Sequence, residues 1–148
     1  MRNRILGMWL LSLLAITACT AQTTNPTPPM IEKIIEAYVA GGDQNNSLVY
    51  QNYQSPDFRV AFNNTAKNTL SIMDNSTYNT MIDNKTFGGD TRKVIMEEVQ
   101  LHGDQIATVK VRLEGKKAIF YNLFSLAKVN GEWLLVQDMV YMTPKAAG

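Results

Sequence analysis

The chain has 148 residues, of which 45% are hydrophobic and 18% are charged, a composition typical of one globular domain with a real core and too short for two. It holds 14 Lys and Arg against 13 Asp and Glu, and without Arg2 and Arg4 near the N-terminus the counts become 12 and 13, a net charge of −1. This near balance argues against a general nucleic-acid binder, which needs clustered positive charge to contact phosphates.

The N-terminal segment has the order of an export signal. Arg2 and Arg4 precede an apolar run over residues 5–16, and small residues follow it. The run of about a dozen residues is shorter than the roughly 20 that a membrane-spanning helix needs. We therefore expect residues 1–18 to be a leader and not a membrane anchor.

Cys19 is the only cysteine in the chain, and it stands where this leader ends. The sequence "ITAC" at residues 16–19 resembles the lipobox of bacterial lipoproteins, whose cysteine carries the lipid and becomes the first residue of the mature protein. The resemblance implies lipid attachment at Cys19 and a protein anchored to a membrane of the bacterial cell envelope, periplasmic or surface-exposed. The alternative is an ordinary secretory leader cut after Ala21. Residues 19–29 hold three prolines among small polar residues, which predicts an extended tether.

Residues 30–143 carry the patterns of a folded domain with helices first. One helical face is formed by Ile31, Ile34, Ile35, Tyr38 and Val39, and Gly41-Gly42 is expected to end that helix. A short second helix is predicted around residues 44–52, with Asp43 as its cap, and strands over 58–63 and 69–73. Asp74 or Ser76 opens a third helix.

From Thr91 onward the apolar residues follow the period of strands. Glycine-centred breaks occur at residues 102–104 and 114–116 and at Asn130-Gly131, the last of which is a strong hairpin signal. The pattern predicts an antiparallel meander of four strands: 93–101, 105–114, 118–129 and 132–143.

The last two of these strands are apolar on both faces. Strict alternation along the last strand puts Trp133, Leu135, Met139 and Tyr141 on one face, and Leu134, Val136, Asp138, Val140 and Met142 on the other. Because the helices can cover only one face, we expect a homodimer in which a second copy covers the other. The alternative is that loops or the tether cover it.

The order of elements resembles that of the nuclear transport factor 2-like superfamily from about Met30 to Met142. This resemblance implies an α+β, cystatin-like cone in which N-terminal helices pack on a curved antiparallel sheet. The end of the chain, "NLFSLAKVNGEWLLVQDMVY", is similar to the end of the lumazine-binding and SnoaL-like groups of that superfamily. The stretch "AYVAGGD" at residues 37–43 resembles the superfamily's helix-one ending. These motifs specify a fold and no particular reaction.

Enzymes of this superfamily, among them ketosteroid isomerases and polyketide cyclases, place an acid or base inside the cone. By resemblance the isomerase base lies on the first strand after helix two. Residues 58–63 contain no carboxylate, which argues against isomerase chemistry. Tyr38 matches the helix-one tyrosine that serves as an oxyanion donor in those enzymes; its alternative is a core position in an apolar stripe.

Asp138 is the candidate acid or base, because it lies mid-strand between apolar neighbours where burial raises a carboxyl pKa. The alternatives are pairing with a Lys or Arg, or exposure near an edge. Asn122, also between apolar residues, either contacts a ligand or satisfies a neighbour. We predict a pocket formed by Tyr38, Phe58, Phe62, Asn122 and Asp138. The lone His102 at a glycine turn is expected to be solvated.

No Cys/His cluster, glycine-rich phosphate loop or nucleophile motif is visible, so we expect neither metal nor cofactor. The leading hypothesis is an envelope lipoprotein that binds a small apolar molecule in its cone without transforming it. A second is an isomerase- or cyclase-type enzyme using Asp138, with Tyr38 as donor. A third is an interaction module whose doubly apolar sheet docks another envelope protein.

Overall fold

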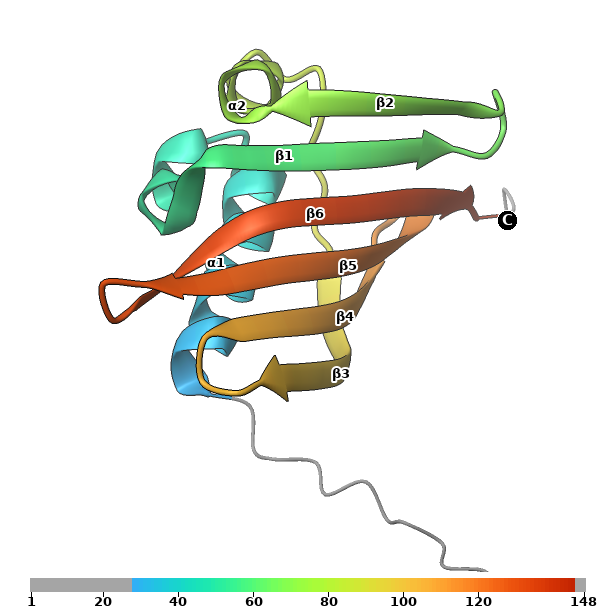
Figure 1. The fold of residues 1–148 in the computed structure, drawn as a ribbon. Helices are drawn as coiled ribbons and strands as arrows, with labels where there is room; N and C mark the ends of the chain where they lie inside the picture. The colour runs from blue at the N-terminus through green and yellow to red at the C-terminus, as the bar shows by residue number, and fades with distance from the viewer. Residues whose placement is uncertain (1–27, 146–148) are drawn as a thin grey trace, which may run out of the picture.

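A curved six-stranded sheet is the main feature of the computed structural model, which describes residues 28–145 (Figure 1). The helical elements are α1 (Pro29–Gln44), two 3-10 turns, η1 (Ser47–Val49) and η2 (Gln51–Tyr53), and α2 (Asn75–Asp83). The strands are β1 (Gln54–Asn64), β2 (Thr69–Asp74), β3 (Lys93–His102), β4 (Ile106–Glu114), β5 (Ala118–Val129) and β6 (Glu132–Pro144).

The strands lie in the order β2-β1-β6-β5-β4-β3. The four-stranded meander predicted from the hairpin breaks is confirmed, since β3 to β6 pair antiparallel in sequence order. The sheet as a whole is mixed, because β1 pairs parallel with β6. No turn motif in the sequence indicates that β1 pairs with β6, because the two strands are far apart in the chain.

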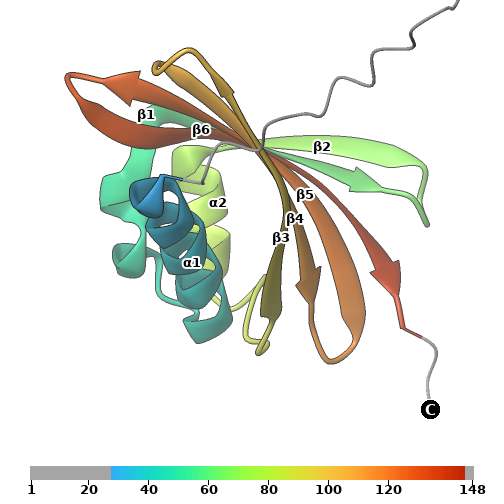
Figure 2. The same ribbon diagram turned by 90° about the horizontal axis from the view of Figure 1, so that it is seen from below.

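The helices lie together on one face of the curved sheet (Figure 2). The predicted face of α1 is confirmed, because Ile31, Ile34, Ile35, Tyr38 and Val39 are all at most 3% exposed. These side chains pack against the inner face of the meander to form one core. Full burial of an aliphatic side chain contributes roughly 1.5–3 kcal/mol, so α1 is held mainly by this stripe. The α+β cone is therefore the fold of this protein.

The end of α1 differs from the prediction. The helix continues through Gly41 and Gly42, both buried, to Gln44, and Asn45 caps it with a left-handed φ of 53°. Gly41 serves close packing, because a Cβ there would lie 2.3 Å from the Tyr50 ring. The predicted helix over 44–52 is wrong: two 3-10 turns stand in its place.

Asp43 does not cap the next element, because it lies inside α1. Asn46 caps η1 instead, with its Oδ1 accepting from the Leu48 amide at 3.2 Å. The cap of α2 is Asp74, one of the two residues expected there, and it accepts from the Thr77 amide at 2.8 Å.

A β-bulge overturns the strict alternation assumed for the last strand. The register passes from Ser125 opposite Gln137 to Leu126 opposite Leu135, so Val136 is an extra residue in β6. Leu135 therefore shares the buried inner face with Asp138 and Val140, and not with Met139 as alternation required. A bulge leaves no clear mark in an apolar strand, which is why the sequence pattern missed it.

The elements run from Pro29 to Pro144. The helix thus takes up Pro29, the final residue of the expected tether, as its first residue, where its missing N–H costs nothing. The expected leader over 1–18 and the lipid site Cys19 lie outside the described residues. No helix among residues 28–145 combines the length and hydropathy that a membrane crossing requires.

Candidate functional site

A cavity of about 440 Å³ lies inside the cone, between the helices and the inner face of the sheet. Its apolar wall comes from strand residues that face inward: Val60, Phe62, Met73, Phe120, Val140 and Met142. The volume falls in the range that small-molecule sites occupy. A second hollow, of about 410 Å³, lies outside the cone at the start of β1 and α2, and its lining residues are mostly exposed.

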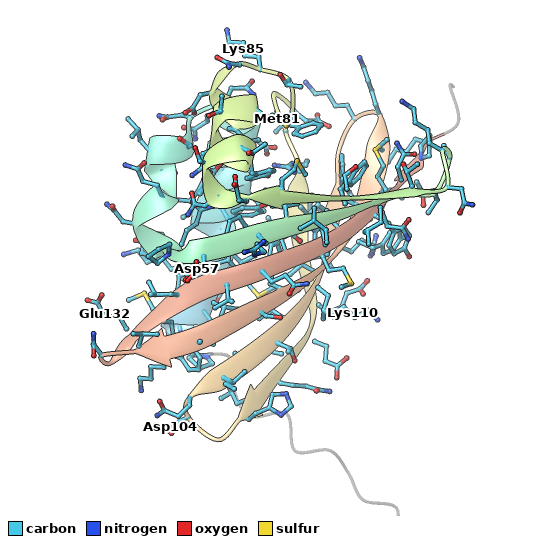
Figure 3. All side chains as sticks on the ribbon, turned by 45° about the horizontal axis from the view of Figure 1, so that its top comes forward. Asp57, Met81, Lys85, Asp104, Lys110 and Glu132 are labelled. Carbon is cyan, nitrogen blue, oxygen red and sulfur yellow. The ribbon has the colours of Figure 1, made fainter. Side chains whose placement is uncertain are left out.

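The cavity has a buried end and an exposed end. The loop after α2 contributes Thr86, Phe87 and Gly88, and Phe87 is 37% exposed. At the other end Tyr38, Asn122 and Asp138 are at most 5% exposed. Figure 3 shows Lys85 at the tip of the α2 end of the molecule, away from Asp104 and Glu132 at the hairpin turns. The loop that begins there therefore forms the outer part of the cavity.

The buried end holds a hydrogen-bonded cluster of three side chains. Tyr38 Oη donates to Asp138 Oδ2 at 3.0 Å. Asn122 Nδ2 donates to Asp138 Oδ1 at 2.8 Å and to Oδ2 at 3.0 Å. The cluster forms because α1 presents Tyr38 to the sheet, while Asp138 on β6 and Asn122 on β5 lie in adjacent rows of the inner face. These are the polar groups that the sequence selected.

Burial controls the protonation of this cluster. Desolvation raises the pKa of Asp138 from 3.8 to about 6, although the donors Asn122 and Tyr38 act in the opposite direction. Burial, and then the neighbouring Asp138 charge, raise the pKa of Tyr38 well above its usual value of 10. Tyr38 is thus a neutral donor, while Asp138 titrates close to neutral pH.

An aromatic cluster fixes the ring of Tyr38. It contacts Tyr50, Phe58 and Phe124 edge-on, with ring centroids 5.1, 5.9 and 5.4 Å away, and it stacks on Tyr78 at 5.8 Å. Such pairs add roughly 0.5–1.5 kcal/mol each beyond the burial of their area. The hydroxyl is therefore held in place toward Asp138.

Arg92 supplies the positive charge at the cavity wall. Its Nε lies 2.5 Å from Asp43 Oδ1, and its Nη2 donates to the Val39 carbonyl at 3.2 Å. The guanidinium also lies 5.6 Å from the centre of the Phe120 ring, within cation–π range. Because Asp43 balances it, Arg92 leaves little net positive charge for a ligand.

Four of the five predicted pocket residues line this one cavity: Tyr38, Phe62, Asn122 and Asp138. Phe58 does not line it; the side chain is fully buried and packs against Tyr38 and Tyr78. Tyr78 and Arg92 also line the cavity, although they were not predicted as site residues. The sequence pattern could have indicated Tyr78, since it lies on the apolar face of α2, whereas no pattern indicated Arg92.

His102 is exposed at the end of β3, as expected for a solvated turn histidine. Within residues 28–145, no group of three or more His, Cys, Asp or Glu side chains is arranged to hold a metal ion. The residues that line the cavity supply carboxyl, phenol, amide and guanidinium groups beside an aromatic wall.

Residues 27–141 match the model of a family described as "Putative lumazine-binding". No curated protein sequence matches the chain. The family match covers most of the chain and all the residues that line the cavity except Met142.

Solved structures share the fold at low identity. A nuclear transport factor 2-like protein of unknown function from Shewanella baltica matches with a TM-score of 0.70 and 20% identity, over 79% of this chain and 94% of that one. A second such protein, from Silicibacter pomeroyi, matches with a TM-score of 0.67 and 11% identity, over 78% and 94%. A ketosteroid isomerase-like protein from Erwinia carotovora atroseptica matches with a TM-score of 0.64 and 14% identity, over 80% and 97%. At these identities the likeness concerns the fold alone.

Proposed function

The chain belongs to the family described as "Putative lumazine-binding", within the nuclear transport factor 2-like fold, and we propose that it binds a small, largely apolar molecule in its cone without transforming it. The wall of the cavity favours apolar rings, since it contains phenylalanine and methionine side chains that adapt to such surfaces.

One observation supports binding without catalysis: the candidate base Asp138 and the candidate donor Tyr38 are hydrogen-bonded to each other. Both oxygens of Asp138 accept hydrogen bonds, one from Asn122 alone and the other from Asn122 and Tyr38. A general base must reach a substrate proton, and an oxyanion donor must have a free hydrogen. Here the carboxylate and the phenol each satisfy the other, so the cluster suits a fixed binding surface.

A second candidate function is proton-transfer catalysis by Asp138. The observation that favours it is the burial-raised pKa of about 6, which would let this carboxyl exchange protons near neutral pH. Replacing Asp138 by Asn keeps the shape of the side chain and a hydrogen bond to Asn122, but the amide can no longer take up or release a proton. Binding that survives in Asp138→Asn, with no turnover in either protein, supports the binding function. Turnover that is present in the wild type and abolished in Asp138→Asn supports the enzyme.

We also propose that Cys19 carries a lipid that anchors the domain in the bacterial envelope. The support is the position of the only cysteine at the end of the leader-like segment. Metabolic labelling with an alkyne fatty acid tests this, with Cys19→Ser as the matched variant. Label on the wild type alone supports the anchor, and an unlabelled wild type that is secreted and cut after Ala21 contradicts it.

The dimer remains a proposal of ours, and the outer face of the sheet supports it. We define the outer patch as five exposed side chains: Leu70, Ile72, Leu123, Met139 and Tyr141, which are 41–64% exposed. Their strands are neighbours, since Ile72, Met139 and Leu123 lie in one row across the sheet. Lys110 projects from β4 at the charged margin of the same face (Figure 3). A second copy presents an identical patch, whereas a different envelope protein is the partner in the interaction-module alternative.

A further inference from the structure

The Arg92 guanidinium bonds to the protein along only one of its edges. Its Nε donates to Asp43 Oδ1, and its Nη2 donates to the Val39 carbonyl at 3.2 Å. Both acceptors belong to α1. Because a guanidinium is planar and holds its five N–H groups in a fixed arrangement, these bonds turn the edge formed by Nε and Nη2 toward α1. Nη1 lies away from that edge and donates to no group that the structure describes.

Nη1 is placed where a molecule in the cavity can reach it. Arg92 lines the cavity, and its guanidinium carbon lies 5.6 Å from the centre of the ring of Phe120, which lines the cavity from the sheet. Among the described residues, the partnerless side-chain nitrogen and oxygen atoms that are closed off from solvent are Asn122 Oδ1 and Tyr50 Oη, and Nη1 is not one of them. The Arg92 side chain as a whole is only 12% exposed. A hydrogen bond made by Nη1 is therefore largely shielded from water.

The carboxylates of the cavity do not compete for Nη1. Asp90 accepts from the backbone amides of Thr91 at 2.7 Å and Lys116 at 3.0 Å. Asp138 is bonded within the buried cluster of the site. In the part of the chain that the structure describes, Arg92 forms an ion pair with neither of them. The unused N–H groups are thus left for a bound molecule or for water.

The charges around the cavity favour a neutral acceptor over an anion. Asp43 already balances the charge of Arg92, which is the one cation among the described residues that line the cavity. Asp90 and Asp138 add carboxylates to the wall. An anion would meet these carboxylates without a free cation to offset them. The oxygen of a neutral carbonyl needs only the unused N–H groups.

We propose that Arg92 is the polar contact of the bound molecule, and that the cavity selects neutral apolar ring molecules whose carbonyl oxygen accepts a hydrogen bond from Arg92 Nη1. This inference rests on the proposed function, because it names the class of molecule that the same cavity binds. The ring of such a molecule contacts the apolar wall, to which Phe62 and Phe120 belong.

Acetophenone and isopropenylbenzene are suitable probes, because they have nearly the same shape and differ in whether an oxygen or a CH₂ group is doubly bonded beside the ring. Their dissociation constants for the full chain are measured by chemical-shift titration. Arg92→Lys keeps a positive charge for Asp43 but removes the second edge of N–H groups. We expect the affinity for acetophenone, relative to isopropenylbenzene, to fall roughly tenfold in this variant. Arg59→Lys is the matched control, because Arg59 is exposed on β1 outside the cone, and it should leave the ratio unchanged.

The infrared carbonyl stretch of acetophenone bound to the wild type tests the same contact without a variant. A hydrogen bond weakens the carbonyl bond, so we expect the stretch at a lower frequency than in cyclohexane. A stretch at the cyclohexane frequency would overturn the inference even if Arg92→Lys does not fold.

The outcomes for the inference and for the binding function are distinct. An affinity ratio that is unchanged in Arg92→Lys, or one that falls in Tyr78→Phe instead, would overturn the assignment to Arg92 and leave the binding function standing. Failure of both probes to bind would contradict the binding function, and the inference would fall with it.

Discussion

Tyr38 and Asp138 are 100 positions apart in the chain, yet the Tyr38 hydroxyl donates to Asp138 Oδ2 across 3.0 Å inside the core. This bond joins α1 to β6, the strand at which the meander meets β1. A helix-one side chain and a last-strand side chain thus define the polar end of the cavity.

Replacing Tyr38 by Phe should raise the pKa of Asp138 above its wild-type value of about 6. The hydroxyl stabilises the ionised carboxylate, and its loss leaves the desolvation of that carboxylate less compensated. The carboxyl ¹³C shift of Asp138, followed against pH, reports this pKa. Tyr50→Phe is the matched control, because Tyr50 packs edge-on against Tyr38 and its hydroxyl has no hydrogen-bond partner among the described residues. An unchanged or lower pKa in Tyr38→Phe would contradict the role assigned to this bond.

Asp138→Asn should change how stability depends on pH. The Asp138 pKa rises from 3.8 to about 6 on folding, so the folded chain binds this proton more tightly than the unfolded chain does. The free energy of unfolding of the wild type should therefore fall, relative to the variant, by roughly 2 kcal/mol as pH rises from 4 to 7, at 1.36 kcal/mol for each pKa unit. Tyr38 and Tyr78 do not interfere, since the pKa of each is raised by burial, that of Tyr78 to about 12.

Urea denaturation of both proteins at several pH values measures this difference. Asp138→Asn is the reference for the wild type, because all other carboxyl groups are common to the two chains. A difference that stays constant from pH 4 to 7 would mean that Asp138 is not desolvated in the folded protein.

The residues on the inner face were predictable because their signals are local. Asp138 and Asn122 stand out as polar positions within apolar strands, and the stripe that carries Tyr38 has helical spacing. Strand period and hairpin glycines placed both strands in one meander. Burial, hydrogen bonding and a shared cavity then follow from neighbouring positions in one sheet.

The features that were not predicted depend on interactions between segments far apart in the chain. The pairing of β1 with β6 and the contact of Arg92 with Asp43 join elements far apart in the chain. Gly41 resembled a helix end, but it is a site where Tyr50 packs against the helix. The bulge at Val136 moved Leu135 to the face opposite the one predicted. None of these contacts has a periodic signal in the sequence.

Gly88 to Ala should destabilise the protein more than Gly103 to Ala. Both glycines have positive φ, 80° and 64°, but a Cβ on Gly88 would lie 2.0 Å from the Gly42 carbonyl oxygen while Gly103 has open space. We expect a loss of roughly 1–2 kcal/mol at Gly103 from backbone strain alone, and roughly 3 kcal/mol or more at Gly88. Thermal and urea unfolding measure both. Equal losses would show that the loop after α2 is not held against α1.

Met139 to Lys should convert the proposed dimer into a monomer. The change puts a charge at the centre of the outer patch, where a second copy would bury it without a partner. Sedimentation velocity measures the change in mass. Leu48→Lys is the matched control, because Leu48 is 68% exposed but lies in η1 and away from the sheet. A wild type that is already monomeric at micromolar concentration would contradict the dimer.

Native mass spectrometry of residues 21–148 shows whether the cone holds a small apolar molecule that it does not transform. We expect each protein molecule to carry one defined small molecule in its cavity, with the same added mass in the wild type and in Asp138→Asn. A wild type that carries no such mass and binds none from a library of apolar ring compounds would contradict it. An added mass that differs between the two proteins, because the wild type has converted the bound molecule and Asp138→Asn has not, would also contradict binding without catalysis.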